Sequence, residues 1–355
     1  MNTAKEDIFY SFLVPVRNTK DYLRECLNSI LIQQYSNFEV IIVDNESNDG
    51  SEKLIDAYAE KDSRVRVIHQ KNAGLLMSRR VAISQATGDY VCFVDSDDFI
   101  VPDYLSAIHT AVQKTEPDIL LIGYQLVDEQ SNLLHDTIQI MPKTIYDSEN
   151  IQDFSVLMAE NPILNNLWLK VAKRSLFDAQ KDNGYRNLGQ MNGVEGLIQS
   201  VEILERAKNI CSIYREKLYC YRIREGSTIR NIDAASRLKE YRVGKESLYH
   251  LAEHYSLNVQ KKVEEKYFPV EVFSAFMIVR DILSSDIAYG AKCKQLDAVR
   301  KDLWAKSILD RISSPRSRRE MILWLIRCKM YFAAYCIVSA VQRLGGVGDQ
   351  SNNTV

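Results

Sequence analysis

The sequence predicts an α/β protein with a doubly wound, mostly parallel sheet and a helical C-terminal extension. Apolar runs that suit strands alternate with helix-patterned stretches over the first 125 residues. From about residue 233 onward the pattern is helical and gives little strand signal. The 355 residues are 46% hydrophobic, which is enough for one sizeable core or two modest ones.

The strands expected in the first third are 9–16, 38–43, 65–68, 90–94 and 119–122. Helices are expected between them, from residue 21, over 51–59 and over about 75–86. This alternation requires crossover connections, so the strands should be parallel, with ligands bound beyond their carboxyl ends. Asp44 and Asp95 follow two of these strands, and we expect both to face one crevice.

The net charge and the spacing of the cysteines limit the kinds of partner and cellular setting that we expect for this protein. The formal net charge is −2, so the chain has no overall bias toward nucleic acid, and we expect no nucleic-acid partner. The seven cysteines lack metal-ligand spacing and are typical of reduced thiols in a cytoplasmic protein. The first residues lack a basic segment followed by an apolar one, so we expect no signal peptide.

The stretch VCFVDSDD (91–98) ends an apolar strand with three carboxylates in four positions. Like charges repel, and burial would raise their pKa values. A divalent cation removes both costs, and ligands that are all oxygen suit Mg²⁺ or Mn²⁺. The alternative is a polar turn that only leads into the next helix, since Pro102 follows soon after Asp98.

Five segments in order resemble the family 2 glycosyltransferases, which are enzymes with the GT-A fold. They are VPVRN (14–18), SILIQQ (29–34), FEVIIVDNESNDGS (38–51), NAGLLMSRR (72–80) and ATGDYVCFVDSDDFIVPDYL (86–105). A looser likeness continues through LWLKVAKRSLF (167–177) to YCYRIREGST (219–228). The resemblance implies a donor-binding half over 1–125, an acceptor-side half over 126–232 and a helical region over 233–355.

The same resemblance assigns roles at the acid cluster. Asp95-Ser96-Asp97 matches the family's DxD-type motif, with Asp97 as the direct ligand of Mn²⁺ or Mg²⁺. Asp95 is expected nearer the ribose and diphosphate, and is also assigned to the metal site. Asp98 either positions the donor sugar or starts the next turn.

On the nucleoside side, Pro15 matches a position whose backbone lies along the base. Asp44 matches the first acid of a pair, and Asn45 stands in place of the second. We expect the amide oxygen of Asn45 to accept a hydrogen bond from a uracil N–H. Arg79 matches a basic residue near the base and phosphates, and its alternative is a surface arginine on a helix.

The family's catalytic base is usually an Asp, preceded by Glu, at the start of a helix in the second half. Here that helix reads VEGLIQSVEILERAKNI (194–210), which places Glu195 on the Glu and Gly196 on the Asp. Three alternatives stay open. Glu195 is the base, another acid (Asp178, Asp182 or Glu202) replaces it, or the protein binds nucleotide-sugar or glycan without turnover and supports a partner transferase.

Four residues are expected at the acceptor or the diphosphate. Trp168 offers an aromatic face to a sugar, although a buried core tryptophan is the common alternative. Lys170 remains from an Asn-Lys pair of the family. Arg222 and Arg224 are expected to reach the diphosphate or the acceptor, or to be solvated surface arginines.

These roles imply an inverting, metal-dependent glycosyltransferase. Its donor is a nucleotide diphosphate sugar, expected to be a UDP-sugar. Its acceptor is a glycan, glycolipid, glycoprotein or lipid-linked saccharide in bacterial surface polysaccharide assembly, such as capsule.

Residues 311–344 combine basic and apolar character. Arginine or lysine occurs at 311, 316, 318, 319, 327 and 329, beside MILWLI (321–326) and an apolar run over 330–341. That run is too short to span a bilayer. Either this segment lies on the anionic inner face of the cell membrane, or it is a core-facing helix with a solvated basic side.

Overall fold

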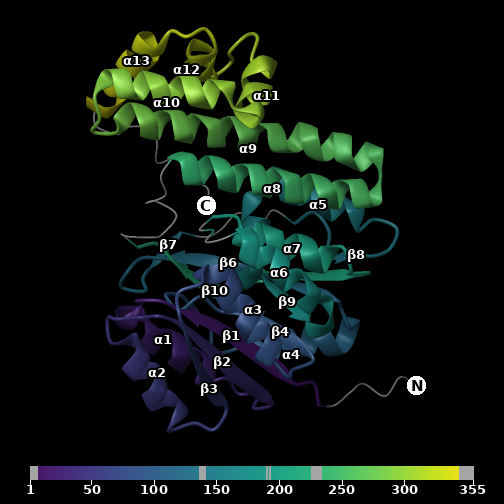
Figure 1. The fold of residues 1–355 in the computed structure, drawn as a ribbon. Coiled ribbons are helices and arrows are strands. Elements are labelled where there is room, and N and C mark those ends of the chain that lie inside the picture. The colour runs from purple at the N-terminus through teal and green to yellow at the C-terminus, as the bar shows by residue number, and fades with distance from the viewer. Residues whose placement is uncertain (1–6, 136–140, 189–190, 192, 225–233, 344–355) are drawn as a thin grey trace. The chain divides into compact units, whose positions relative to one another are not determined.

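The computed structural model describes residues 7–135, 141–188, 191, 193–224 and 234–343 (Figure 1). The chain forms two compact units. Unit 1 comprises residues 1–155 and 164–229, and unit 2 comprises 156–163 and 230–355. The sheet belongs to unit 1, and unit 2 is helical in its described part.

The sheet has ten strands, in the order β3-β2-β1-β4-β9-β6-β10-β5, with β7 beside β6 and β8 beside β10. Their bounds are β1 (Tyr10–Val16), β2 (Phe38–Asn45), β3 (Val65–Gln70), β4 (Tyr90–Phe93), β5 (Phe99–Ile100), β6 (Ile119–Val127), β7 (Leu133–His135), β8 (Ile145–Tyr146), β9 (Lys170–Lys173) and β10 (Ile210–Arg222). The five strands expected from the sequence are confirmed as β1 to β4 and β6.

The α/β class is confirmed, and the sheet is mixed rather than mostly parallel. Strands β3, β2, β1 and β4 pair in parallel, as the crossover helices require. The short strand β9 then enters between β4 and β6 and pairs antiparallel with both. Every residue of β1 is buried, because that strand lies within the sheet and is covered on both faces.

The helices of unit 1 connect these strands. They are α1 (Lys20–Leu31), α2 (Ser51–Ala59), α3 (Gly74–Gln85), α4 (Tyr104–Thr115), α6 (Asp182–Leu188) and α7 (Glu195–Leu204), while α5 (Gln152–Glu160) is shared by the two units. In α1 the residues Leu23, Cys26, Leu27 and Ile30 are buried at helical spacing, which fixes the face that packs on the sheet.

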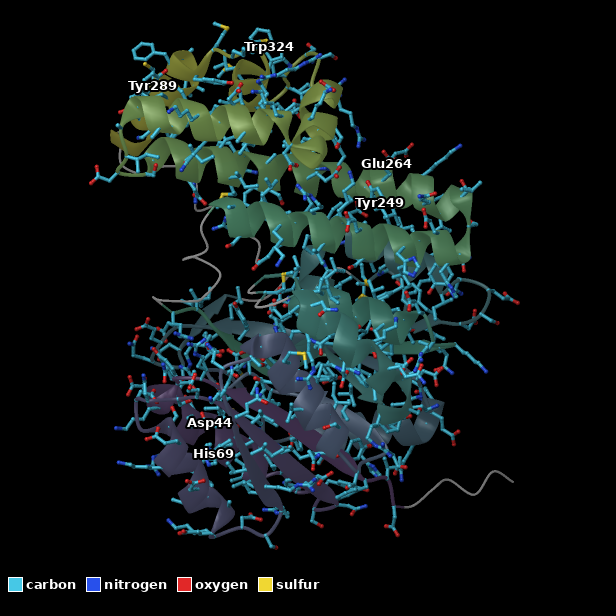
Figure 2. The ribbon with its side chains drawn as sticks, viewed as in Figure 1. Asp44, His69, Tyr249, Glu264, Tyr289 and Trp324 are labelled. Atoms are coloured by element: carbon cyan, nitrogen blue, oxygen red, sulfur yellow. The ribbon has the colours of Figure 1, made fainter. Side chains whose placement is uncertain are left out.

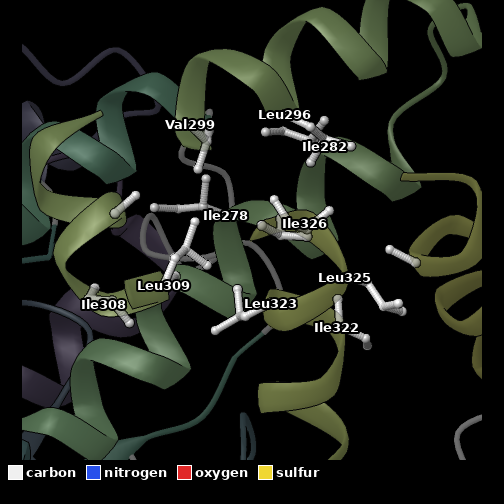
Figure 3. Close-up of a cluster of buried hydrophobic side chains, with 14 of the residues drawn as sticks. Ile278, Ile282, Leu296, Val299, Ile308, Leu309, Ile322, Leu323, Leu325 and Ile326 are labelled. Atoms are coloured by element: carbon white, nitrogen blue, oxygen red, sulfur yellow. The ribbon is translucent and has the colours of Figure 1, made fainter. Parts of the chain in front are cut away.

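Unit 2 is built on the long helix α9 (Leu257–Ser284). Helix α8 (Ala234–Tyr255) packs on one side of it, and α10 (Tyr289–Lys301), α11 (Leu303–Arg311), α12 (Arg318–Arg327) and α13 (Tyr331–Arg343) pack on the other (Figure 1). Their buried side chains form one core, part of which Figure 3 shows.

Most of the apolar side chains in the segment 321–326 belong to the core of unit 2. Ile322, Leu323, Leu325 and Ile326 of α12 are buried in it, so the core-facing alternative holds for this helix. The Arg319 guanidinium lies 4.8 Å from the centroid of the Phe273 ring. Within the described part of the chain, no helix is long and apolar enough to cross a bilayer.

Candidate active site

The acid turn, residues 95–98, follows β4 directly. The Asp98 N–H donates to the carbonyl of Asp95 at 3.0 Å, which closes the turn. The Tyr219 hydroxyl oxygen accepts from the Asp95 N–H at 3.1 Å, so strand β10 holds the turn from a second side. The side chains of Asp95 and Asp97 stay 22% and 26% exposed, which leaves both within reach of a ligand.

Two arginines neutralise the exposed acids of the turn. Arg79 of α3 donates from Nη2 to Oδ1 of Asp95 at 2.8 Å. Arg224, just past β10, donates from Nε to Oδ2 of Asp97 at 2.7 Å. Burial lowers the pKa of each guanidinium, but attraction to its aspartate outweighs burial and raises the pKa overall.

Asp98 has a different environment from its two neighbours. It is 2% exposed, and its Oδ2 accepts from the Tyr219 hydroxyl at 2.7 Å. Its Oδ1 accepts from the Arg222 N–H at 2.8 Å. Burial, and then the nearby charges of Asp97 and Asp95, raise the pKa of Asp98 well above its usual range. Asp98 therefore ties the acid turn to β10.

The acid turn opens onto a cavity of about 210 Å³ in unit 1. Its lining residues come from strand ends and helix starts on one edge of the sheet. They are Pro15, Val16, Arg17, Thr19, Asn45, Gly74, Leu75, Ser78, Arg79, Asp95, Ser96, Asp97, Asp98, Asn166, Trp168, Glu195, Tyr221 and Arg224. The structure thus brings together most of the site residues predicted from the sequence.

Glu195, the first residue of α7, lines this cavity and is 9% exposed. Burial lowers the pKa of Arg79, and the charges of Asp95 and then Glu195 raise it. Glu195 therefore lies close enough to attract the Arg79 guanidinium. A carboxylate from α7 therefore lines the same cavity as the acid turn, at the residue that the sequence offered as one of three alternatives for the base.

The backbone of the 165–166 segment lies close to Gly196. A Cβ built on Gly196 would lie 3.0 Å from the Asn165 carbonyl oxygen and 3.3 Å from the Asn166 Cα. The Ser200 hydroxyl donates to the same Asn165 carbonyl at 2.8 Å. The aspartate of the family at this position would therefore require the 165–166 backbone to move.

The other acids considered as bases form a separate network. Arg80 donates to both oxygens of Glu202, at 3.1 and 2.9 Å, and to Asp182 at 2.6 Å. Glu202 also accepts from the Asp178 N–H at 2.6 Å, and Asp178 pairs with Arg206. Among the described residues that line the cavity, none of these three acids appears.

Trp168 is buried, and its ring face is already in use. Its ring centroid lies 4.7 Å from that of Tyr219 and 5.3 Å from that of Tyr221, with interplanar angles of 18° and 16°. Because the residue is only 2% exposed, it presents little more than an edge to the cavity. Most of the Trp168 side chain is therefore packed in the core, as the alternative to a sugar-binding role expected.

Lys170 and Arg222, both predicted to contact the acceptor or the diphosphate, are buried and bonded to other parts of the protein. Lys170 donates from Nζ to the carbonyls of Leu164 and Asn166, the latter at 2.8 Å, and burial lowers its pKa to about 7. Arg222 donates to the Asp97 carbonyl at 2.8 Å and pairs with Glu25 at 2.6 Å. Neither belongs to the described lining of the cavity.

The nucleoside side also differs from the prediction in part. Asp44 accepts from the Ser47 N–H at 3.1 Å and lies 2.9 Å from Nδ1 of His69, so its carboxylate faces β3 and α2 (Figure 2). Asn45 lines the cavity, but its amide oxygen already accepts from Gln70 at 3.1 Å and Ala73 at 2.9 Å. The bond from a uracil N–H to that oxygen stays a prediction, and it requires one of these two donors to be displaced.

Comparison with known proteins identifies the fold and a similarity to one family. Residues 11–165 match the family described as glycosyl transferase family 2. The chain is 31% identical over 232 residues to glycosyltransferase GlyA of Streptococcus pneumoniae, and 32% identical over 220 residues to the putative glycosyltransferase EpsH of Bacillus subtilis. The similarity to glycosyl transferase family 2 is therefore shown for residues 11–165.

The matched regions cover only part of this chain and only part of each relative. The alignments cover 61% and 62% of this chain, but 31% of GlyA and 62% of EpsH. The crystal structure of S. aureus TarS residues 1–349 superimposes with a TM-score of 0.62 at 19% identity, over 95% of this chain and 92% of that one. The predicted GT-A fold is thereby confirmed.

Some lining residues of the cavity were missed by the sequence reasoning. Arg17, Thr19 and Ser78 lie in or beside the matched segments, so position next to a motif was the available signal. Asn166 and Tyr221 lie outside the matched 11–165 region and became visible only from the three-dimensional arrangement.

Proposed function

We propose that this chain belongs to glycosyl transferase family 2 and transfers a sugar from a nucleoside diphosphate sugar to an acceptor hydroxyl, in one inverting displacement. One observation carries the proposal. A single cavity is lined by two exposed aspartates, by two arginines that pair with them and by a separate carboxylate, Glu195. Such an arrangement suits a diphosphate leaving group beside the arginines and a proton acceptor, Glu195, in the same cavity.

In the proposed reaction, the acceptor oxygen bonds to the anomeric carbon from the face opposite the diphosphate. The bond from that carbon to the diphosphate oxygen breaks, and the diphosphate leaves with the electron pair. Glu195 takes the hydroxyl proton. Arg79 and Arg224 place positive charge beside the departing group. Because the carbon is attacked only once, its configuration inverts.

The acid turn suits Mn²⁺ or Mg²⁺ bound together with the donor. Each of Asp95 and Asp97 is bonded to its arginine through one oxygen, which leaves a second oxygen as a hard ligand. Among the described residues, no three His, Cys, Asp or Glu side chains converge on a metal position. Protein sites for Mg²⁺ often supply only one or two carboxylates beside substrate phosphates. When bound, the ion neutralises charge on the diphosphate.

We further propose a UDP-sugar donor and a glycan or lipid-linked acceptor of bacterial surface polysaccharide. TarS has been crystallised with UDP and with UDP-GlcNAc, and both structures resemble this fold, with TM-scores of 0.58 and 0.53. A putative teichuronic acid biosynthesis glycosyltransferase of B. subtilis, TuaG, is 30% identical over 138 residues. Residues 1–125 would bind the donor and 126–232 the acceptor. The seven free cysteines support a cytoplasmic setting.

A silent binding protein is the second candidate, and Gly196 favours it. The family's usual base is missing there, and the nearby backbone leaves little room for one. Such a protein would bind nucleotide-sugar without turnover and support a partner transferase.

A donor panel separates the two candidates. The protein is incubated with UDP- and GDP-sugars and Mn²⁺, and free nucleoside diphosphate is measured with and without cell-derived acceptor. If the protein is an enzyme, we expect nucleoside diphosphate to be released from one donor, and acceptor to increase that release. Donor binding without release under every condition would assign the silent role. Failure to bind any nucleotide would reject both.

A further inference from the structure

The outward side of α13 in unit 2 is apolar. From Tyr331 to Val341 the helix has no charged residue, although a surface helix normally presents charge to water. Ala334 and Val338 are buried in the core, and they fix the inner side. The row Phe332, Cys336 and Ala340, spaced by four residues, is exposed.

Aromatic side chains extend this apolar side beyond the helix. Phe332 is 66% exposed and Met330, just before α13, is 48% exposed. Tyr289, at the start of α10, is 41% exposed, and its ring centroid lies 6.1 Å from that of Phe332. Figure 2 shows Tyr289 and Trp324 at the same end of unit 2. We call Tyr289, Met330, Phe332, Cys336 and Ala340 the α13 patch.

The segment that carries α13 is rich in positive charge. Residues 230–355 contain 21 Lys and Arg against 14 Asp and Glu, a net charge of +7, whereas residues 1–229 contain 24 against 33, a net charge of −9. The excess is concentrated at 311–343, which holds seven basic residues and one acid, Glu320. Arg318 and Lys329 of this segment are exposed.

An anionic lipid surface matches both properties of the α13 patch. We propose that unit 2 docks on the headgroups of an anionic bilayer, with Phe332 and its neighbours in the interface and Arg318 and Lys329 against lipid phosphates. At about 1.5 Å per residue, the 13-residue helix spans about 20 Å, less than a bilayer's apolar thickness, so it lies in the plane of the membrane. A second copy that docked through its own α13 patch is a poorer occupant, because two facing 311–343 segments would carry the same positive charge.

Vesicle flotation of the full chain tests the proposal. We expect it to float with phosphatidylcholine vesicles that contain phosphatidylglycerol, to stay unbound with phosphatidylcholine alone, and to be released by high salt. Phe332→Ser should weaken binding about tenfold, because it removes a large apolar side chain from the interface. Arg318→Gln with Lys329→Gln should weaken it by at least about tenfold.

Leu257→Ser is the matched control, because Leu257 is 76% exposed but lies at the start of α9, outside the α13 patch. It should float like the parent. The proposal fails if the parent does not bind anionic vesicles at low salt, or if Phe332→Ser and Leu257→Ser behave alike. It also fails if light scattering finds a dimer that Phe332→Ser dissociates and vesicles do not bind. None of these outcomes depends on transferase activity, so the proposed function is tested separately.

Discussion

At the scale of single residues, the acid turn shows how closely spaced carboxylates are neutralised. Three carboxylates at a strand end required positive charge, and the sequence pointed to a metal ion. The structure adds two guanidinium groups, from Arg79 and Arg224, that neutralise Asp95 and Asp97 through protein contacts. Arg79 stood in a motif next to the site. Arg224 is 127 residues from Asp97, so its pairing could not be derived from local pattern.

Arg224 should compete with a metal ion for Asp97, because its Nε lies 2.7 Å from Oδ2 of that aspartate. We expect Arg224→Gln to bind Mn²⁺ about tenfold more tightly than the parent when UDP is absent, since one competing unit charge is removed. Electron paramagnetic resonance of free Mn²⁺ measures this affinity. Arg17→Gln, which removes another charge from the cavity lining, is the control. Equal affinities for parent and Arg224→Gln would contradict the competition.

Glu195 is the residue on which turnover should depend most. Glu195→Gln keeps the shape but removes the proton acceptor, so turnover should fall about a hundredfold or more while UDP affinity stays unchanged. Steady-state release of UDP and calorimetric UDP binding give the two readouts. Asp178→Asn, at an acid outside the described cavity lining, should retain turnover. Unchanged turnover in Glu195→Gln would remove it as the base.

Strand alternation separates residues that line the cavity from their neighbours in the chain that do not. Asp44 and Asn45 are consecutive on β2, and of the two only Asn45 lines the cavity. Tyr221 and Arg222 are consecutive on β10, and of the two only Tyr221 lines it. Successive strand residues point to opposite faces, but the sequence does not say which face holds the ligand.

At the scale of elements, the sequence specified the first half of unit 1 well. Strands β1 to β4 and their helices follow strong periodic signals, and each was expected within a few residues. Strand β9 was missed because four residues, KVAK, carry no periodicity, and because its pairing with β4 and β6 is long-range. The mixed character of the sheet depends on that strand.

The pairing of β6 with β10 depends on Gly123. A Cβ there would lie 2.1 Å from the Tyr214 carbonyl oxygen and 2.6 Å from that of Glu216, where the register of β10 shifts. Gly123→Ala should therefore lower the free energy of unfolding by about 3 kcal/mol, measured by urea denaturation. Gly184→Ala meets nothing within 4 Å and should be neutral or slightly stabilising. Equal stability of the two variants would show that the backbone around Gly123 yields freely.

Lys170, at the start of β9, should make stability depend on pH. Burial lowers its pKa to about 7 from an ordinary 10.5, so above pH 7 the folded protein holds fewer protons here than the unfolded chain. The contribution of Lys170 to the free energy of unfolding should therefore rise by about 1.4 kcal/mol per pH unit between pH 7.5 and 9.5. Urea denaturation across this range measures it. Lys170→Met should lack the rise, and an equal slope in both proteins would exclude Lys170 as its source.

The two surfaces proposed to bind ligands belong to different units of the molecule. Every described residue that lines the cavity belongs to unit 1, and the α13 patch belongs to unit 2. The opposite net charges of 1–229 and 230–355 follow the same division. The sequence pattern located the start of the helical region, since periodicity changes there. It could not show which apolar residues of that region stay exposed, because an amphipathic pattern looks the same whatever covers it.

Hydrogen exchange of the full chain tests this division. UDP with Mn²⁺ should protect peptides around 15–19, 72–80, 93–98 and 221–224, because these contain cavity residues and a bound ligand stabilises the state that it binds. Peptides of α8 to α13 should exchange at the same rate with and without ligand. Asp97→Ala should abolish the part of the protection that needs Mn²⁺, since it removes the expected metal ligand. Protection within 234–343 would instead mean that donor binding is coupled to unit 2, and the two proposed surfaces would then not be independent.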